Sequence, residues 1–358
     1  MSLTNLEGPQ AGAEQRIDAL DVLRGVGVLG ILLLNIQSFA MPSAAYLNPS
    51  VYGDRTGANG VVWHATHLFG DQKFMAIFAL LFGAGIVLMT SRAEARTGRS
   101  AALHYRRMGW LIVFGLLHAY LLWYGDILYT YGVCGLAVYL VRRRPAGQLI
   151  ALSVVLLAIP SGLIAVLSWL LAAGYWPPEI VTFVAETWAP APAVLASEVE
   201  VYRGGWLAQM PSRAAEAILL QTLLFFLGGL GARAAALMML GMALFRLRIL
   251  TGEQSARFYA VLAAVGLGAG LPMVELGVQQ HEAHGWGFEH SLLLGAQYNF
   301  WGAVLVALGY VGLILLACRL LGAGHLVLRP LAAAGRMAFT NYIAHTLICT
   351  TIFYGHGF

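Results

Sequence analysis

The sequence predicts an all-α protein, a polytopic transmembrane helical bundle, and three observations predict it. Of the 358 residues, 59% are hydrophobic and 11% are charged, and the mean hydropathy is +0.73. A soluble domain has about 25% charged residues. Apolar runs close to the roughly 20 residues that a helix needs to cross a bilayer recur along the chain. The sequence lacks the alternating ten-residue segments of barrel strands, which excludes an outer-membrane barrel.

Nine apolar windows mark the expected membrane spans. They cover residues 22–41, 69–90, 108–125, 127–141, 148–172, 214–245, 258–278, 292–317 and 336–354. The 214–245 window is too long for one upright helix and contains Gly228, Gly229 and Gly231. We therefore expect a break, a tilt or an interfacial first half there, and we count the window as one crossing.

The basic residues predict how this bundle is oriented. Most of the 21 lysines and arginines precede the first span or lie in alternate connections between spans. The other connections, residues 42–68, 173–213 and 279–291, are mainly acidic. By the positive-inside rule the N-terminus is cytoplasmic and these three loops lie outside. The 173–213 loop has tryptophans among prolines, so we expect it at the outer interface, as a lid or as a connector.

The remaining composition bounds the domains and partners. We expect residues 1–16 to form a cytoplasmic tail and residues 17–358 to form a single transmembrane domain. The acidic N-terminal segment lacks the layout of a cleaved signal, so the first helix is expected to stay in the mature chain. The net charge of +4 is interpreted as a topology determinant, so the lipid bilayer is the expected environment and nucleic acid is not a partner. Three scattered cysteines indicate no metal site.

Ionisable groups at membrane depth are the best functional pointers in such a chain, because burying them without a partner is costly. In the first span, Asp21, Arg24 and Asn35 form a polar stripe at helical spacing, with Asp21 and Arg24 at the cytoplasmic mouth. Arg24 there can meet a polyanionic ligand. An ion pair at the start of a helix explains the same two residues equally well.

The second span opens outside with His64, His67 and Asp71 on one helix face, followed by Lys73. Solvated histidines at a membrane edge are a more common explanation than a metal site, so we assign no metal here. Lys73 lies deeper and needs a partner, such as a carboxylate from another helix. We therefore assign Asp71 and Lys73, together with Asn341 of the ninth span, to a polar pathway.

The third and fourth spans form a hairpin that contains His118 and Asp126. His118 lies about 12 Å further along the helix than Asp126 and is flanked by apolar and aromatic residues. A neutral imidazole can sit at that depth and still accept a proton, which makes His118 a candidate general base. The alternative is a core histidine that bonds to a neighbouring helix.

Five blocks of sequence resemble one known family. They are RIDALDVLRGVGVLGILLLNIQSFA at 16–40, DQKFMAIFALLFGAG at 71–85, GLLHAYLLWYGDILYTYGVCGL at 115–136, MMLGMALFR at 238–246 and GRMAFTNYIAHTLICTTIFYG at 335–355. In this order they are similar to the YeiB-like family of bacterial inner-membrane proteins, a domain of unknown function. That family resembles, more distantly, the transmembrane acyltransferase superfamily, which includes acyltransferase-3 proteins and lysosomal heparan-α-glucosaminide N-acetyltransferase. The shared L-D-x-x-R-G block is Leu20, Asp21, Arg24 and Gly25 here.

The resemblance implies a multi-pass inner-membrane bundle of about ten helices. Acetyl-CoA or another acyl-CoA would dock from the cytoplasm, and the acyl group would reach an acceptor at the outer face. Family members continue past the FYG block into one more helix and a cytoplasmic tail, which we expect this chain to lack. His345 stands where relatives usually have glutamine, so we transfer no family role to it.

The sequence therefore predicts a membrane acyltransferase whose acceptor is a small molecule, a glycan or a lipid. Arg24, Asp21 and Arg336 are expected to hold the anionic donor at the cytoplasmic mouth. His118 is the expected base, Asp126 orients it, and Asn35 polarises the thioester carbonyl. A transporter or exporter that uses Asp71, Lys73 and His118 as a pathway is one alternative, and a membrane protein without catalytic turnover is another. The sequence leaves the oligomeric state open.

Overall fold

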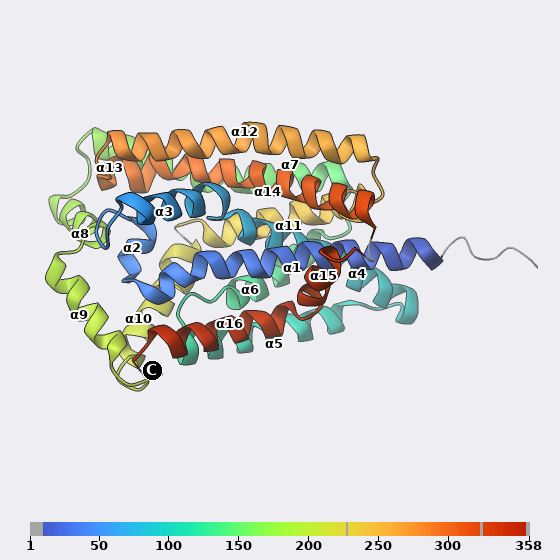
Figure 1. Cartoon of the computed structure of the whole chain (residues 1–358), viewed down its shortest axis with the longest axis horizontal. Helices are drawn as coiled ribbons and strands as arrows, with labels where there is room; N and C mark the ends of the chain where they lie inside the picture. Colours follow the sequence, from blue (N-terminus) through green and yellow to red (C-terminus); the bar gives the residue numbers. More distant parts are fainter. Residues whose placement is uncertain (1–9, 227, 323–324, 356–358) are drawn as a thin grey trace, which may run out of the picture.

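The structure is a computed structural model that describes residues 10–226, 228–322 and 325–355, with side chains from residue 19 onward. Within these residues all regular structure is helical, and the long helices share one axis (Figure 1). In chain order the elements are α1 (Gln10–Ala40), α2 (Ser43–Leu47), α3 (Gly57–Phe69), α4 (Lys73–Thr97), α5 (Ala101–Leu117), η1 (His118–Leu122), α6 (Leu128–Val138), η2 (Tyr139–Val141), α7 (Ala146–Ala172), α8 (Pro178–Trp188), α9 (Pro192–Arg203), α10 (Met210–Leu219), η3 (Leu220–Leu224), α11 (Leu230–Arg246), α12 (Ala256–Ala283), α13 (Phe288–His290), η4 (Ser291–Gly295), α14 (Ala296–Leu321), α15 (Leu328–Arg336) and α16 (Ala338–Phe353).

Several of these helices suit a bilayer. Five stretches of the described chain are long and apolar enough to cross a membrane, or six if the bent pair α8 and α9 is one span. They are Ala19–Ala40, Gly57–Thr97, Ala146–Ala172, Ala256–Ala283 and Phe288–Leu321. The helix α7 is apolar on all sides and exposes Val154, Val155 and Ile159, which suits contact with lipid. The length and composition of these helices are those of a helical membrane protein.

Nine crossings remain a prediction. Four of the predicted spans fall on α5, α6, α11 and α16, which are shorter helices or parts of broken ones. The helix α6 together with η2 runs from Leu128 to Val141 and is about 20 Å long, whereas the hydrocarbon core of a bilayer is about 30 Å thick. Length and apolar composition therefore do not establish that each of these helices crosses the membrane alone.

The connections gather at two ends of the bundle (Figure 1). The arginine-rich joints between α4 and α5, α6 and α7, α11 and α12, and α14 and α15 lie at the end where α1 begins, which we call the basic end. The helices α2, α8 and α9 lie at the opposite end, which we call the far end. The two groups of connections that the charge pattern separates are thus apart in space.

Some predicted boundaries need correction. The predicted 42–68 loop contains α2 and α3, and the 173–213 loop contains α8, α9 and the start of α10. The second span begins at Lys73 because the chain turns at residues 70–72, where Gln72 has a φ of 63°. The expected break in 214–245 is confirmed, since α11 begins after Gly229, whose φ is 74°. The helix α1 starts at Gln10, inside the predicted 1–16 tail, of which residues 1–9 lie outside the described residues.

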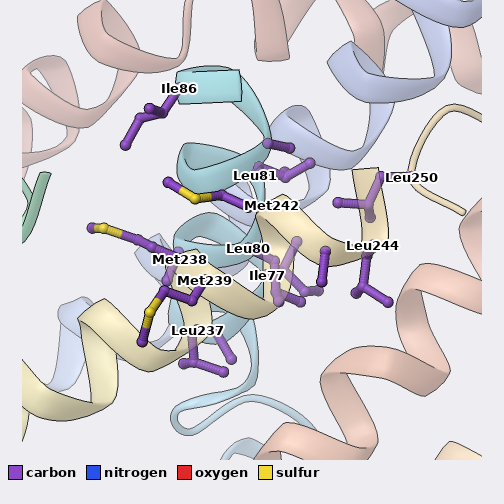
Figure 2. Close-up of a cluster of buried hydrophobic side chains, with 14 of the residues drawn as sticks. Ile77, Leu80, Leu81, Ile86, Leu237, Met238, Met239, Met242, Leu244 and Leu250 are labelled. Carbon is purple, nitrogen blue, oxygen red and sulfur yellow. The ribbon is translucent and has the colours of Figure 1, made fainter. Parts of the chain in front are cut away.

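The core centres on the crossing of α4 and α11, where Leu80, Met238 and Met242 are fully buried (Figure 2). A Cβ atom on Gly83 would overlap the carbonyl of Met238, and one on Gly241 would overlap the carbonyl of Leu80. Small residues let helix backbones approach this closely in lipid. These reciprocal contacts fix α4 and α11 against each other.

Candidate functional site

The hairpin between α5 and α6 turns inside the molecule. The helix continues from α5 into the π-turn η1, which starts at His118, and ends where Trp123 adopts an extended backbone conformation. Trp123, Tyr124 and Asp126 are all buried, although they belong to a connection between two helices. This turn therefore carries polar groups into a part of the bundle that excludes water.

His118 and Asp126 meet in this turn. The imidazole Nδ1 lies 2.9 Å from Oδ2 of Asp126, and each side chain is 1% exposed. The other carboxylate oxygen accepts the backbone N–H of Tyr129 at 2.7 Å, which fixes the carboxylate. The Nδ1 contact is close but is not aligned as a hydrogen bond. Catalytic hydrogen bonds are often poorly aligned until a ligand is bound.

The second nitrogen of His118 meets a hydroxyl group that the sequence analysis did not select. Nε2 lies 2.9 Å from Oγ1 of Thr346, which is 1% exposed on α16. A carboxylate, an imidazole and a hydroxyl thus stand in a row, the arrangement by which a histidine takes a proton from an oxygen nucleophile. Thr346 gave no signal in the sequence, because threonines in apolar helices often bond their own backbone.

Aromatic rings enclose the imidazole. The rings of Tyr342 and Trp123 lie 5.1 and 6.4 Å from it, measured between centroids. Phe39 of α1 packs on Trp123 at 4.3 Å. An apolar enclosure of this kind strengthens the electrostatic interactions inside it, because it excludes water.

Asn35 lies on the face of α1 that packs against this hairpin. Val28 shares a buried cluster with Leu128 and Tyr342, and Leu32 packs with Ala119 and Trp123. One face of the helix carries positions 28, 32, 35 and 39. Asn35 therefore lies between Leu32 and Phe39, which both pack against the hairpin. Asn35 is half-buried, and within the described residues its amide makes no side-chain hydrogen bond. Its role at the thioester carbonyl stays a prediction.

A segment from the far end covers the hairpin. The indole N–H of Trp206 and a guanidinium N–H of Arg213 both donate to the carbonyl of Leu121, at 2.7 and 2.9 Å. Arg213 is fully buried and also donates to Gln209 at 2.8 Å. The end of the predicted outer loop therefore closes over η1. A lid that opens and closes over the hairpin would make these contacts when closed, and a segment that never moves would make the same contacts.

The predicted donor residues gather at the basic end. Arg24 donates to Asp21 at 2.7 Å and remains one-third exposed, while Asp21 is buried. The helix α15 crosses α1 so closely that a Cβ on Gly335 would overlap the carbonyl of Asp21. Arg336 follows Gly335 and is exposed. The structure thus places the Asp21–Arg24 pair next to the helix end that carries Arg336, and the donor site that these residues were predicted to form stays a prediction.

A second polar network lies at the turn between α3 and α4. Lys73 is fully buried, and its ammonium donates to Oδ1 of Asn299 and to the carbonyl of His67, both at 2.7 Å. The Asn299 amide donates in turn to Asp71 at 2.6 Å. Lys73 thus reaches a carboxylate through an amide of α14. Burial, together with the Asp71 carboxylate, raises the pKa of the nearby Tyr46 phenol well above its usual value.

The remaining candidates take structural positions. The Asn341 amide donates to the carbonyl of Ala334 at 2.9 Å and so bridges the joint between α15 and α16. None of the hydrogen bonds given for the described residues links it to Lys73 or Asp71, with which it was predicted to form a pathway. His64 pairs with Glu275 at 2.9 Å at the far end. Across the described residues no three His, Cys, Asp or Glu side chains are arranged to hold a metal ion.

Comparison with known proteins gives the following relatives. The family described as "Protein of unknown function (DUF418)" matches residues 244–358. The chain is 36% identical over 350 residues to the uncharacterized protein YeiB of Escherichia coli (strain K12), which covers 96% of this chain and 85% of that protein. It is 28% identical over 366 residues to the uncharacterized protein YxaH of Bacillus subtilis (strain 168), with 96% and 83% covered. No solved structure matches the chain.

Proposed function

This chain belongs to the YeiB-like family of proteins of unknown function, and on that premise we propose that it is a membrane acyltransferase with His118 as its base. One observation supports this proposal above the others. A buried imidazole has a fixed carboxylate at one nitrogen and a hydroxyl at the other, 2.9 Å away in each case. Such a pair of neighbours suits a group that takes a proton from a nucleophile and returns it to a leaving group.

The proposed reaction moves an acyl group from a thioester to a hydroxyl or amine. His118 takes the proton of the acceptor as the acceptor attacks the thioester carbonyl, and Asp126 stabilises the imidazolium that forms. The C–S bond then breaks, and the proton passes from His118 to the departing thiolate of CoA. Asn35, on the facing side of α1, donates a hydrogen bond to the oxygen that becomes negative. Thr346 is a positioning residue, whose hydroxyl holds Nε2 of the resting imidazole and gives up that position when the proton of the acceptor arrives.

The two substrates would arrive from opposite ends. The exposed arginines Arg24 and Arg336 suit the phosphates of acetyl-CoA or another acyl-CoA at the basic end. The acceptor, a small molecule, a glycan or a lipid, would enter at the far end, under the segment that carries Trp206 and Arg213. By the positive-inside rule the basic end faces the cytoplasm and the protein resides in the bacterial inner membrane.

One specific observation favours a second candidate function. The helices α3 and α4 are separated by a turn that carries Asp71 next to the buried Lys73. Helices that break near buried charges form the substrate sites of many secondary transporters. Uptake of a substrate into proteoliposomes without acyl-CoA would favour transport. If no ligand changes the protein in any assay, a role without turnover is favoured.

The donor site is tested by the unfolding midpoint of the purified protein in detergent, measured with acetyl-CoA, with CoA and with ATP. A ligand that binds the folded state raises its stability by about 2.7 kcal/mol at a hundredfold excess over Kd. We expect acetyl-CoA and CoA to raise the midpoint and ATP, a comparable polyphosphate, to leave it unchanged. The double variant R24Q/R336Q should lose the shift, whereas R257Q, at another exposed arginine of the basic end, should keep it. Equal shifts with ATP would contradict a CoA site.

A further inference from the structure

Two helices begin inside the bundle, and their first turns lie together. The helix α4 starts after the turn at residues 70–72, and α11 starts after Gly229. Both N-cap residues, Gln72 and Gly229, have left-handed backbone conformations, and neither helix has a side chain that caps its first N–H groups. Helix N-termini carry partial positive charge. Since α4 and α11 cross at Gly83 and Gly241, neither terminus can move far from the other.

Each of these two termini carries a buried cation in its first turn. Lys73 is the first residue of α4 and is 0% exposed, and Arg233 is in the first turn of α11 and is 9% exposed. Lys73 and Arg233 bond to consecutive residues of α14, Asn299 and Phe300, which places the two cations near each other. Asp71 joins the same network through the Asn299 amide. Two positive side chains and two positive helix ends thus share one carboxylate.

The hydrogen bonds of this cluster are incomplete. Arg233 donates one guanidinium N–H to the carbonyl of Phe300 at 2.5 Å and lies over the Phe300 ring at 4.3 Å. Its other terminal nitrogen, Nη2, is buried and has no hydrogen-bond partner in the structure. A buried guanidinium with a free donor costs free energy until an acceptor reaches it. With His67 neutral, the side chains of the cluster carry one positive charge in excess.

We propose that this cluster is a binding site for a monovalent oxyanion, held between Lys73 and Arg233 at the N-termini of α4 and α11. One negative charge balances the excess, and its oxygen atoms provide the acceptor that the free Nη2 lacks, next to the positive ends of two helices. A soluble carboxylate and the phosphodiester of an anionic lipid share this chemistry. The site is separate from the His118 hairpin and does not depend on the acyltransferase proposal.

The test uses the whole chain in detergent, without acyl-CoA, and measures its unfolding midpoint. Sodium acetate is titrated in place of sodium chloride at constant ionic strength. We expect a saturable rise of about 2–4 °C for the wild type, because binding to the folded state alone stabilises it. A second series places the protein in phosphatidylcholine nanodiscs with and without phosphatidylglycerol, which tests the lipid source. A saturable rise in either series supports the site and identifies its ligand.

Variants locate the effect. R233Q and K73Q should each remove the rise, because each removes the charge excess. R233K should keep part of it, and R257Q, at the exposed start of α12, should keep all of it. Equal midpoints in acetate, chloride and both lipid mixtures would overturn the proposal. A rise that survives in both R233Q and K73Q would overturn it as well, since the anion would then bind elsewhere.

Discussion

The His118 hairpin and the Lys73 cluster differ in how their charges are balanced. In the hairpin, one buried carboxylate faces an imidazole that becomes its opposite charge when it takes up a proton, so protonation of His118 balances Asp126. In the cluster, Lys73 and Arg233 are two buried basic side chains beside one carboxylate. The difference teaches that buried polar residues in one bundle can serve chemistry at one place and ligand binding at another.

The largest difference between the two regions should appear when the aspartate of each is changed to asparagine. Asp126→Asn keeps an oxygen for the Tyr129 N–H but removes the charge that stabilises protonated His118. We expect acyl transfer to fall about 10²- to 10⁴-fold, with little change in the unfolding midpoint. The rate of label transfer from acetyl-CoA to membranes checks this. Asp54→Asn, in an exposed loop, is the matched control, and equal rates for both variants would contradict the role of Asp126.

The corresponding change in the cluster should act on stability. Asp71→Asn can still accept from Asn299, but it leaves Lys73 and Arg233 without a carboxylate. Removing one partner of a directly paired buried ion pair costs about 3–5 kcal/mol. Asp71 reaches Lys73 through Asn299 and is one-fifth exposed, so denaturant midpoints should fall, but by less than this. The rate per folded molecule should stay near that of the wild type. If Asp71→Asn instead abolishes transfer and leaves stability intact, the roles of the two regions are not separate.

A smaller effect is expected at Thr346. Thr346→Val removes the hydroxyl beside Nε2 of His118 and preserves the shape of the side chain. A positioning bond contributes about 1 kcal/mol, so the rate should fall about five- to tenfold. Thr346→Ser should restore most of it. Complete loss of transfer in Thr346→Val would mean that this hydroxyl takes the acyl group itself.

The smallest effect should come from the cover of the hairpin. Trp206→Phe removes one of the two donors to the Leu121 carbonyl and leaves the Arg213 bond in place. We expect a loss of about 0.5–1.5 kcal/mol that appears as faster amide hydrogen exchange over residues 118–123. Trp169→Phe, on the exposed face of α7, should leave this exchange unchanged. Unchanged exchange in Trp206→Phe would mean that the segment does not hold the hairpin closed.

The sequence predicted an all-helical architecture and the family, and both are confirmed. The five or six long apolar helices are consistent with the membrane class that it also predicted. It also paired His118 with Asp126, because eight residues of a hairpin keep them near each other. Thr346 and Asn299 lie more than 220 residues away from the groups they meet, and Arg233 lies 67 residues from its partner Phe300. Spacing carries no information about such contacts. The helices in the outer loops were missed because they are short, and two of them, α8 and α9, mix apolar with acidic residues.

The glycines at the contact between α4 and α11 could not be recognised from the sequence. Gly83 and Gly241 each lie against a carbonyl of the partner helix. They allow α4 and α11 to approach each other, which is a property of the pair of helices and not of either helix alone. A single sequence shows only that small residues are frequent in the spans. The position of both helix starts, and with them the cluster of buried cations, therefore required the structure.

The most direct test of the central claim compares His118→Asn with His345→Asn, a substitution at a half-buried histidine on α16. Purified protein in proteoliposomes is given labelled acetyl-CoA and membranes, and the label that enters the membrane fraction is counted alongside the unfolding midpoint. The account predicts that His118→Asn folds, still responds to CoA and loses at least a hundredfold in rate, while His345→Asn stays near the wild type. A His118→Asn protein that transfers label at the wild-type rate would contradict it.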